Sequence, residues 1–395
     1  IPQFLANRFP ERGTALRVTS AIIIVAFFTV YTAAGLVGGG KLFETAFAGI
    51  LPNTGLSDYM LGIVITAGIV LAYTMVGGFL AVSLTDFVQG LIMMGALVIM
   101  PLVVMFGPGG SAGGSLTEVP IEGFLDLTYG LTAIGFISAV TWGLGYFGQP
   151  HIIVRFMAIN RVENVRRAAA FGMGWMGIAL LGSIGLGIAG RAYAERNGLV
   201  VDDPETIFIV LAQLLFHPAV TGFLYAALLA AIMSTISSQL LVSSSSLTED
   251  FYRLFLRRNA SEREAVNVSR GAVALVAVAA IVIAADPNSQ VLGLVSNAWA
   301  GFGAAFGPLI LLALMWHGKD GTHGTGMTGA GAVAGLVTGA GVVAGWIALG
   351  WNAQLPAALG GGPGLYEIVP GFAAAMAAII VVSKFTRPNN AKGAL

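Results

Sequence analysis

Cysteine is absent from the 395 residues, and charged residues are scarce. The lack of thiols excludes disulfide bonds, thiolate metal sites and cysteine nucleophiles. The 19 lysines and arginines balance the 19 acidic residues, and a net charge of zero argues against a nucleic-acid partner. The sequence also has no Gly-x-x-x-x-Gly-Lys-Ser/Thr phosphate loop, which excludes an ATP-driven pump built on that loop.

Apolar residues fill most of the chain. They make up 56% of it, and 10% of the residues are charged, against about 25% in soluble domains. A transmembrane helix needs about 20 predominantly apolar residues. Ten stretches approach or exceed this length: 16–37, 59–80, 84–106, 132–154, 168–190, 206–243, 270–285, 290–316, 325–350 and 366–384. Because long runs lack the alternation of β-barrel strands, the predicted class is an all-α integral membrane protein with about ten transmembrane helices.

The basic residues orient these helices. With the N-terminus on the cytoplasmic side, 16 of the 19 lysines and arginines fall on cytoplasmic segments. The opposite side retains only Lys41, Arg191 and Arg196. Cytoplasmic loops of membrane proteins are enriched in Lys and Arg, so we expect both ends of this chain to be cytoplasmic.

The fourth stretch contains a predicted break. Three glycines and Pro150 lie within the eight residues 143–150, and each of these residue types weakens a helix. Backbone groups freed inside a membrane must face protein or a watery cavity. Trp142 and Tyr146, one helical turn apart, would give that cavity two aromatic walls. An aromatic girdle at the membrane interface, followed by a proline at the helix end, explains the same residues equally well.

The sixth stretch contains a hydroxyl-rich face. Ser234, Thr235 and Ser238 share that face, and neutral oxygen donors suit a hard cation. Serines in membrane helices also bond back to their own backbone or to a neighbouring helix, so the pattern alone leaves both readings open. Asp86, at the inner end of the third stretch, is expected to be a helix N-cap.

Six segments resemble the sodium:solute symporter family, and several of them resemble its proline branch. They are residues 77–83, 143–151, 155–158, 231–250, 297–308 and 365–368. The resemblance extends over essentially the whole chain. It implies a LeuT-type fold, in which two five-helix repeats of inverted topology enclose a site near the midplane of the bilayer.

The resemblance also implies how the chain divides. Residues 1–395 are expected to form a single transmembrane transporter domain. Core helices three to ten occupy approximately 16–316, and two additional C-terminal helices occupy approximately 325–384. The chain begins with Ile1, and residues 1–15 resemble the loop before the family's fourth helix. We therefore expect an N-terminally truncated fragment that lacks the family's first helix and the first two core helices.

Site residues follow from the resemblance, position by position. It assigns the sodium ligands to Ala231, Ser234 and Thr235. It assigns the proline site to Tyr31, Trp142, Tyr146 and Pro150. The implied function is sodium-coupled symport of L-proline into the cell by alternating access, with no enzymatic step.

The remaining expectations concern partners and location. Sodium is co-transported, proline is the small-molecule substrate, and membrane lipid surrounds a multi-pass protein of the bacterial inner membrane. No nucleic acid and no obligate protein partner are expected. Two alternatives stay open: a sodium symporter for another small solute, such as pantothenate or a monocarboxylate, or the transporter-like input domain of a sensor kinase.

Overall fold

The computed structural model describes residues 1–107, 119–316, 326–352 and 364–387. Within these ranges the regular secondary structure is helical throughout. The elements are α1 (Pro2–Arg8), η1 (Pro10–Arg12), α2 (Gly13–Ala46), α3 (Asp58–Phe106), α4 (Ala133–Thr141), η4 (Trp142–Gly148), α5 (Pro150–Met157), α6 (Asn164–Asn197), η5 (Pro204–Thr206), α7 (Ile207–Leu215), α8 (Pro218–Ser245), η6 (Ser246–Leu256), α9 (Glu262–Ala284), α10 (Val291–Met315), α11 (Gly329–Ala348) and α13 (Ile368–Thr386).

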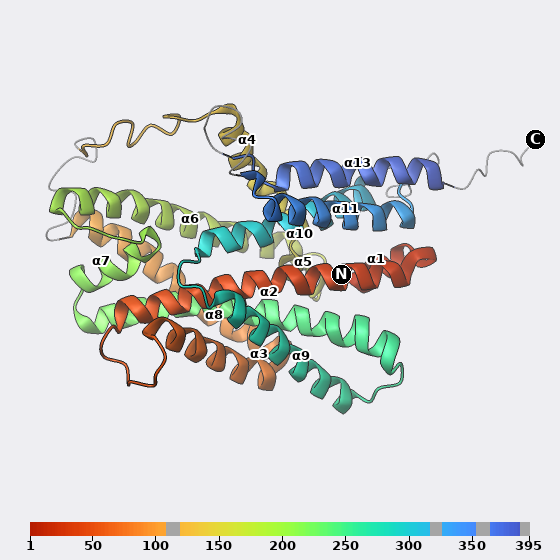
Figure 1. The fold of residues 1–395 in the computed structure, drawn as a ribbon, viewed down its shortest axis with the longest axis horizontal. Helices are drawn as coiled ribbons and strands as arrows, with labels where there is room; N and C mark the ends of the chain where they lie inside the picture. The colour runs from red at the N-terminus through yellow and green to blue at the C-terminus, as the bar shows by residue number, and fades with distance from the viewer. Residues whose placement is uncertain (108–118, 317–325, 353–363, 388–395) are drawn as a thin grey trace, which may run out of the picture.

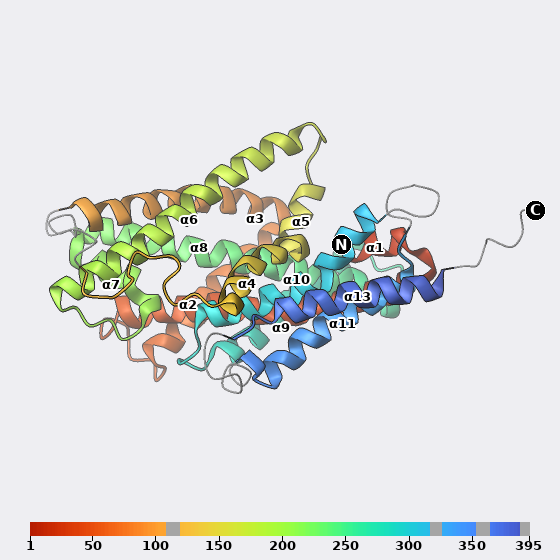
Figure 2. The same ribbon diagram turned by 90° about the horizontal axis from the view of Figure 1, so that it is seen from above.

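Eight of the described helices are long and apolar enough to cross a membrane. Most of them run roughly along the long axis of the molecule (Figure 1). The prediction of an all-α multi-pass membrane protein is confirmed. Among the eight, α10 is the most buried and α6 the least, and Figure 2 shows α6 along one outer edge of the bundle. Residue 325, where the ninth predicted span begins, lies outside the described ranges.

The second and third predicted spans are the two halves of α3. Gly78 interrupts this helix with φ of 57° and ψ of −158°, a left-handed conformation that glycine adopts most readily. The ring of Tyr59, in the first turn of α3, packs against Gly40 of α2. Val104, in the last turn of α3, shares a hydrophobic cluster with Leu42 of α2. Both ends of α3 therefore lie at the same end of α2, and α3 is a helical hairpin.

The sixth predicted span, 206–243, is not one helix. The helix α7 ends at Leu215, and α8 begins at Pro218. A proline at the first helical position has no amide hydrogen to leave unpaired, so this position starts a helix readily. The Nδ1 atom of His217 accepts a hydrogen bond from a backbone amide in the first turn of α8. The helix then continues into the π-helical segment η6, which ends at Leu256.

A charged cluster, formed by Lys41, Asp203 and Glu205, joins three elements at the C-terminal end of α2. Lys41 donates hydrogen bonds to Asp203 at 2.6 Å and to Glu205 at 2.7 Å. The carboxylate of Glu205 also accepts from the backbone amides of Val291 and Leu292, each at 2.9 Å. Glu205 therefore caps the N-terminus of α10 from another part of the chain, which ties α2, η5 and α10 together.

Candidate functional site

The predicted break in the fourth span is present in the structure. α4 ends at Thr141, a 3-10 segment (η4) follows, Gln149 is extended, and Pro150 starts α5. The Gln149 side chain is fully buried. Its amide donates to the carbonyl of Gly145 at 3.1 Å and to that of Trp299 at 3.3 Å. Gln149 thus bonds backbone carbonyls on both sides of the break, and it ties η4 to α10.

Trp142 and Tyr146 meet on the same partner. Trp299 of α10 stacks on Trp142 with ring centroids 5.7 Å apart and an interplanar angle of 17°. Tyr146 meets Trp299 edge-on at 4.7 Å. Tyr366, just before α13, also stacks on Trp142 at 5.6 Å. We call Trp142, Tyr146, Trp299 and Tyr366 the aromatic cluster.

Glycines allow η4 to lie directly on α10. A methyl group on Gly145 would overlap with the indole of Trp299. A methyl group on Gly148 would overlap with the carbonyl oxygen of Phe302 and lie 2.8 Å from the Cα of Gly303. The glycines that weaken the helix therefore also bring the two backbones into contact.

The three predicted sodium ligands lie together on α8. The Oγ atom of Ser234 donates to the carbonyl of Ala231 at 3.1 Å, and the Oγ1 atom of Thr235 donates to the same carbonyl at 3.0 Å. This is the back-bonding that serines and threonines make inside helices, and it gathers three neutral oxygens at one point. Within the described ranges, no group of three or more His, Asp or Glu residues could hold a metal ion. A cation at this point would therefore rely on neutral oxygens, which fits a hard ion.

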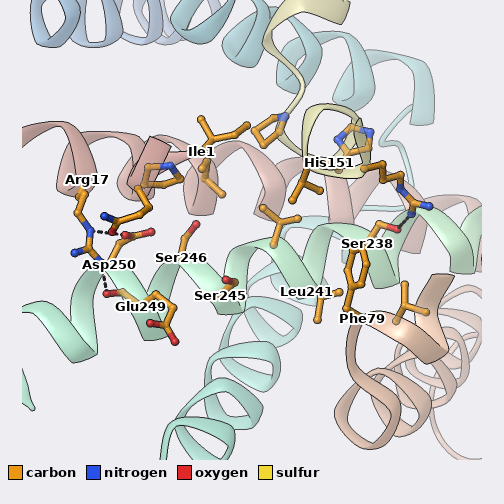
Figure 3. A pocket seen from close by; sticks show the side chains of 18 of the residues that line it. Ile1, Arg17, Phe79, His151, Ser238, Leu241, Ser245, Ser246, Glu249 and Asp250 are labelled. Carbon is orange, nitrogen blue, oxygen red and sulfur yellow. Dashed lines mark hydrogen bonds and ion pairs between the residues drawn. The ribbon is translucent and has the colours of Figure 1, made fainter. Parts of the chain in front are cut away.

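A cavity of about 450 Å³ lies between the start of the chain, α2, α5 and α8 (Figure 3). Of the seven predicted site residues, only Pro150 lines it. Tyr31 lies beside it, with its ring edge-on to that of His151 at 6.1 Å. The aromatic cluster and the Ala231 group therefore do not line this cavity, whereas Pro150 lines it and Tyr31 contacts its lining residue His151.

The sequence predicts that Asp86 is a helix N-cap, but the structure places it inside α3 as an ion-pair partner. Its Oδ2 atom accepts from Arg155 at 2.5 Å and from Ser238 at 3.1 Å. Arg155 also donates to the Ser238 hydroxyl at 2.7 Å. The expectation is wrong because the chain reverses at Gly78, so a new helix is already established before Asp86. The residues are 69 and 152 positions apart, and no local pattern pairs them.

A second ion pair lines the same cavity. Arg17 of α2 donates to Asp250 at 2.7 Å and to the backbone carbonyl of Glu249 at 2.7 Å. Both acceptors belong to η6. Figure 3 shows this pair at the opposite end of the cavity from Ser238. A charged side chain that contacts α8 or its extension η6 therefore lies at each end of the cavity.

Sequence reasoning missed Trp299 and Tyr366 as site residues. Both lie in segments that carry the family resemblance, but the resemblance assigns neither residue to the sodium site or the proline site. A tryptophan in an apolar helix is indistinguishable from a core residue by hydropathy. Only the packing of α10 and α13 against η4 reveals the contact of each with Trp142.

Comparison with known proteins identifies similar transporters. The family model described as the sodium:solute symporter family matches residues 1–339. The osmoregulated proline transporter OpuE of Bacillus subtilis is 48% identical over 389 residues, which cover 98% of this chain and 74% of that protein. A sodium/proline symporter of Staphylococcus aureus is 49% identical over 398 residues, covering 99% and 73% respectively.

A solved structure has a similar fold. It is the substrate-bound, outward-open state of a Na+-coupled sialic acid symporter, with a TM-score of 0.68 and 18% sequence identity, covering 98% of this chain and 77% of that one. The likeness supports the LeuT-type arrangement expected from the resemblance. Together with the family match and the near-half identity over almost the entire chain, it leads to one conclusion: the protein belongs to the sodium:solute symporter family.

Proposed function

We propose that this protein carries out sodium-coupled symport of L-proline into the cell by alternating access. Two relatives of nearly half identity are named as proline transporters, and its family couples solute movement to sodium. The structural observation that carries the proposal is the break at η4, where a membrane span opens its backbone beside aromatic rings. Such discontinuous helices form the solute sites of transporters with inverted repeats.

Proline suits the chemistry around η4. Its compact apolar ring can lie against the rings of Trp142 and Tyr146, and Tyr146 is 40% exposed and so accessible. Its charged ends require the polar backbone groups that the 3-10 geometry releases. Pro150 and Tyr31 complete the proposed site on the side toward α2. These four assignments are part of the proposal.

Sodium is proposed to bind at Ala231, Ser234 and Thr235. Neutral oxygens hold the ion without a fixed negative charge, so it can leave on the inner side. One sodium ion moving down about 100 mV gains about 2.3 kcal/mol. That free energy alone supports about a fifty-fold proline gradient, since about 1.4 kcal/mol corresponds to tenfold. The cycle needs binding and rearrangement of helices only.

The proposed location is a bacterial plasma membrane, with both ends of the chain on the cytoplasmic side. The concentration of 16 of 19 basic residues on one set of segments supports this orientation. Figure 1 places α1, the α8–α9 connection and the C-terminal end of α13 at one end of the bundle. Lipid and a small solute are the proposed partners; we propose no nucleic acid and no obligate protein partner.

Uptake of labelled proline tests the proposal. The chain spans about three quarters of its relatives' length, so the measurement uses the product of the complete gene in proteoliposomes, with an inward sodium gradient or with potassium replacing sodium. We expect uptake with sodium only. Uptake of another solute but not of proline would reject the substrate assignment, and equal uptake in potassium would reject coupling.

Paired variants test the sodium site. Ser234→Ala and Thr235→Val each remove an oxygen with little change in volume. We expect the sodium concentration for half-maximal uptake to rise about tenfold, because a hydrogen-bonding group to a charge contributes about 1.5 kcal/mol or more. Ser183→Ala is the control, because Ser183 makes the same kind of back-bond on α6, to the carbonyl of Ala179 at 2.8 Å. An unchanged sodium dependence at normal expression would reduce Ser234 and Thr235 to helix packing.

A further inference from the structure

Trp299 lies at the point where α10 crosses η4. It is 6% exposed, and its indole N–H donates to the backbone carbonyl of Trp142 at 3.0 Å. Trp142 is the first residue of the 3-10 segment. The bond therefore reaches the backbone at the point where α-helical geometry ends. An unpaired carbonyl there would be costly in a membrane, so the indole N–H helps to keep the break in place.

The ring of Trp299 contacts both aromatic residues of the proposed solute site. It is stacked on Trp142 and edge-on to Tyr146, at centroid distances of 5.7 and 4.7 Å. Aromatic pairs at such distances hold preferred relative orientations. Gly145 lies directly against the indole, where any side chain would overlap with it. One indole therefore sets where both rings stand.

The backbone around Trp299 is held by Tyr366, just before α13, and by Gln149, just before α5. Tyr366 donates its hydroxyl hydrogen to the carbonyl of Ser296 at 2.8 Å, one turn before Trp299 on α10. The amide of Gln149 bonds the carbonyl of Trp299. With both the backbone and the neighbouring turn tied, the indole has little freedom to move. A rigid neighbour of this kind can define a distance.

We propose that Trp299 is the positioning residue that sets the spacing of the Trp142 and Tyr146 rings, and thereby the size of the solute ring that the transporter accepts. The proposal rests on the proposed function and deepens it. Trp299 acts through the two rings and the η4 backbone. A smaller side chain at this position would let the two rings separate and would release the Trp142 carbonyl.

The test is Trp299→Phe in the complete gene product, assayed with a series of cyclic amino acids. The solutes are azetidine-2-carboxylate, proline and pipecolate, with four-, five- and six-membered rings. We expect the KM for proline to rise about tenfold, as for loss of a contact of about 1.4 kcal/mol, while the maximal rate changes less than about twofold. The preference for pipecolate relative to proline should rise about tenfold by the same constant. The sodium dependence should stay unchanged.

Trp175→Phe is the matched control. The Trp175 indole on α6 donates to the backbone carbonyl of Gly90 in α3 at 3.0 Å, the same bond as that of Trp299 but outside the aromatic cluster. Its loss should leave ring-size selectivity unchanged. If Trp299→Phe alters no selectivity, or lowers transport of all three solutes equally, the specificity role is wrong.

A second measurement does not depend on transport. In near-ultraviolet circular dichroism, Trp142→Phe and Trp299→Phe should each abolish the signal of the stacked indole pair, and the double variant should lose no more. The change in Trp175→Phe should add independently. Additive losses for Trp142 and Trp299 would overturn the positioning. Failure of the wild-type protein to take up proline would instead reject the proposed function, and with it the role of Trp299 in ring-size selectivity. The circular dichroism result would still show whether Trp142 and Trp299 are stacked.

Discussion

Adding one methyl group at Gly148 tests whether η4 packs on α10 as the structure shows. In Gly148→Ala the new Cβ overlaps with the carbonyl oxygen of Phe302 and lies 2.8 Å from the Cα of Gly303. Both neighbours are backbone atoms inside α10, so neither can rotate away. Relief requires the two segments to separate. Variants of this kind cost about 1–3 kcal/mol, and a contact between two backbones belongs near the upper end of that range.

The unfolded chain offsets part of this loss. Replacing glycine by alanine at an unstrained position stabilises a protein by about 0.4–1 kcal/mol through the unfolded state. The net expectation for Gly148→Ala is a loss of about 2–2.6 kcal/mol. Gly143→Ala is the control in the same 3-10 segment. Apart from the adjacent backbone, no atom lies within 4 Å of the position its methyl group would take, and the φ of Gly143 is not positive. It should be neutral or slightly stabilising.

Thermal unfolding of the purified variants in detergent, followed by tryptophan fluorescence, measures the difference. Gly148→Ala should unfold a few degrees lower than the wild type, since about 1 kcal/mol corresponds to about 2 °C or more in a large domain. Proline uptake should fall with it, because a displaced η4 carries Trp142 and Tyr146 away from Trp299. Equal unfolding temperatures for Gly148→Ala and Gly143→Ala would refute the close packing of η4 on α10.

Two further predictions concern the cluster of Lys41, Asp203 and Glu205 and the membrane topology. Burial raises the pKa of Glu205, but hydrogen bonds from the α10 amides and from Lys41 outweigh this and lower its pKa below the ordinary 4.5. A carboxyl with a lowered pKa stabilises the folded protein at pH values above its ordinary pKa, and this stability is lost as the pH falls through the folded-state pKa. The thermal unfolding temperature should therefore fall below about pH 4.5. Glu205→Gln should be less stable than the wild type at pH 7 and should lose less stability on acidification, whereas identical pH profiles would contradict the role of Glu205. The chain has no cysteine, so a single cysteine at Asn53 should react with an impermeant thiol reagent from outside and one at Ser261 only after permeabilisation; the reverse pattern would invert the topology.

The membrane spans were largely predictable from the sequence, because the length of an apolar run reports directly on the thickness it must cross. The break at η4 was also predictable, because glycine and proline weaken a helix wherever they stand. The separation of α7 from α8 was missed. Pro218 lies within an apolar run, and hydropathy does not distinguish a proline that starts a helix from one that bends it.

The site residues also divide into those that the sequence could predict and those that it could not. The sequence pattern places Ser234 and Thr235 on one helical face, and the family resemblance adds Ala231; the hydrogen bonds on α8 bring the three oxygens together. Trp299 lies 157 positions from Trp142, and helical periodicity carries no information about which faces of distant helices meet. The contact between Trp299 and Trp142 depends on how distant helices pack, so local sequence patterns could not predict it.

The reversal of the chain at Gly78 bears on how the protein enters the membrane during synthesis. Residues Asp58–Phe106 contain no lysine or arginine, so the hairpin has no positive charge of its own to fix which side of the membrane its tip faces. Its direction must come from basic residues on neighbouring segments, such as those near Arg17 and Arg155. The hairpin should therefore insert as one paired unit, and a new arginine near Phe106 would compete with its neighbours to turn it over.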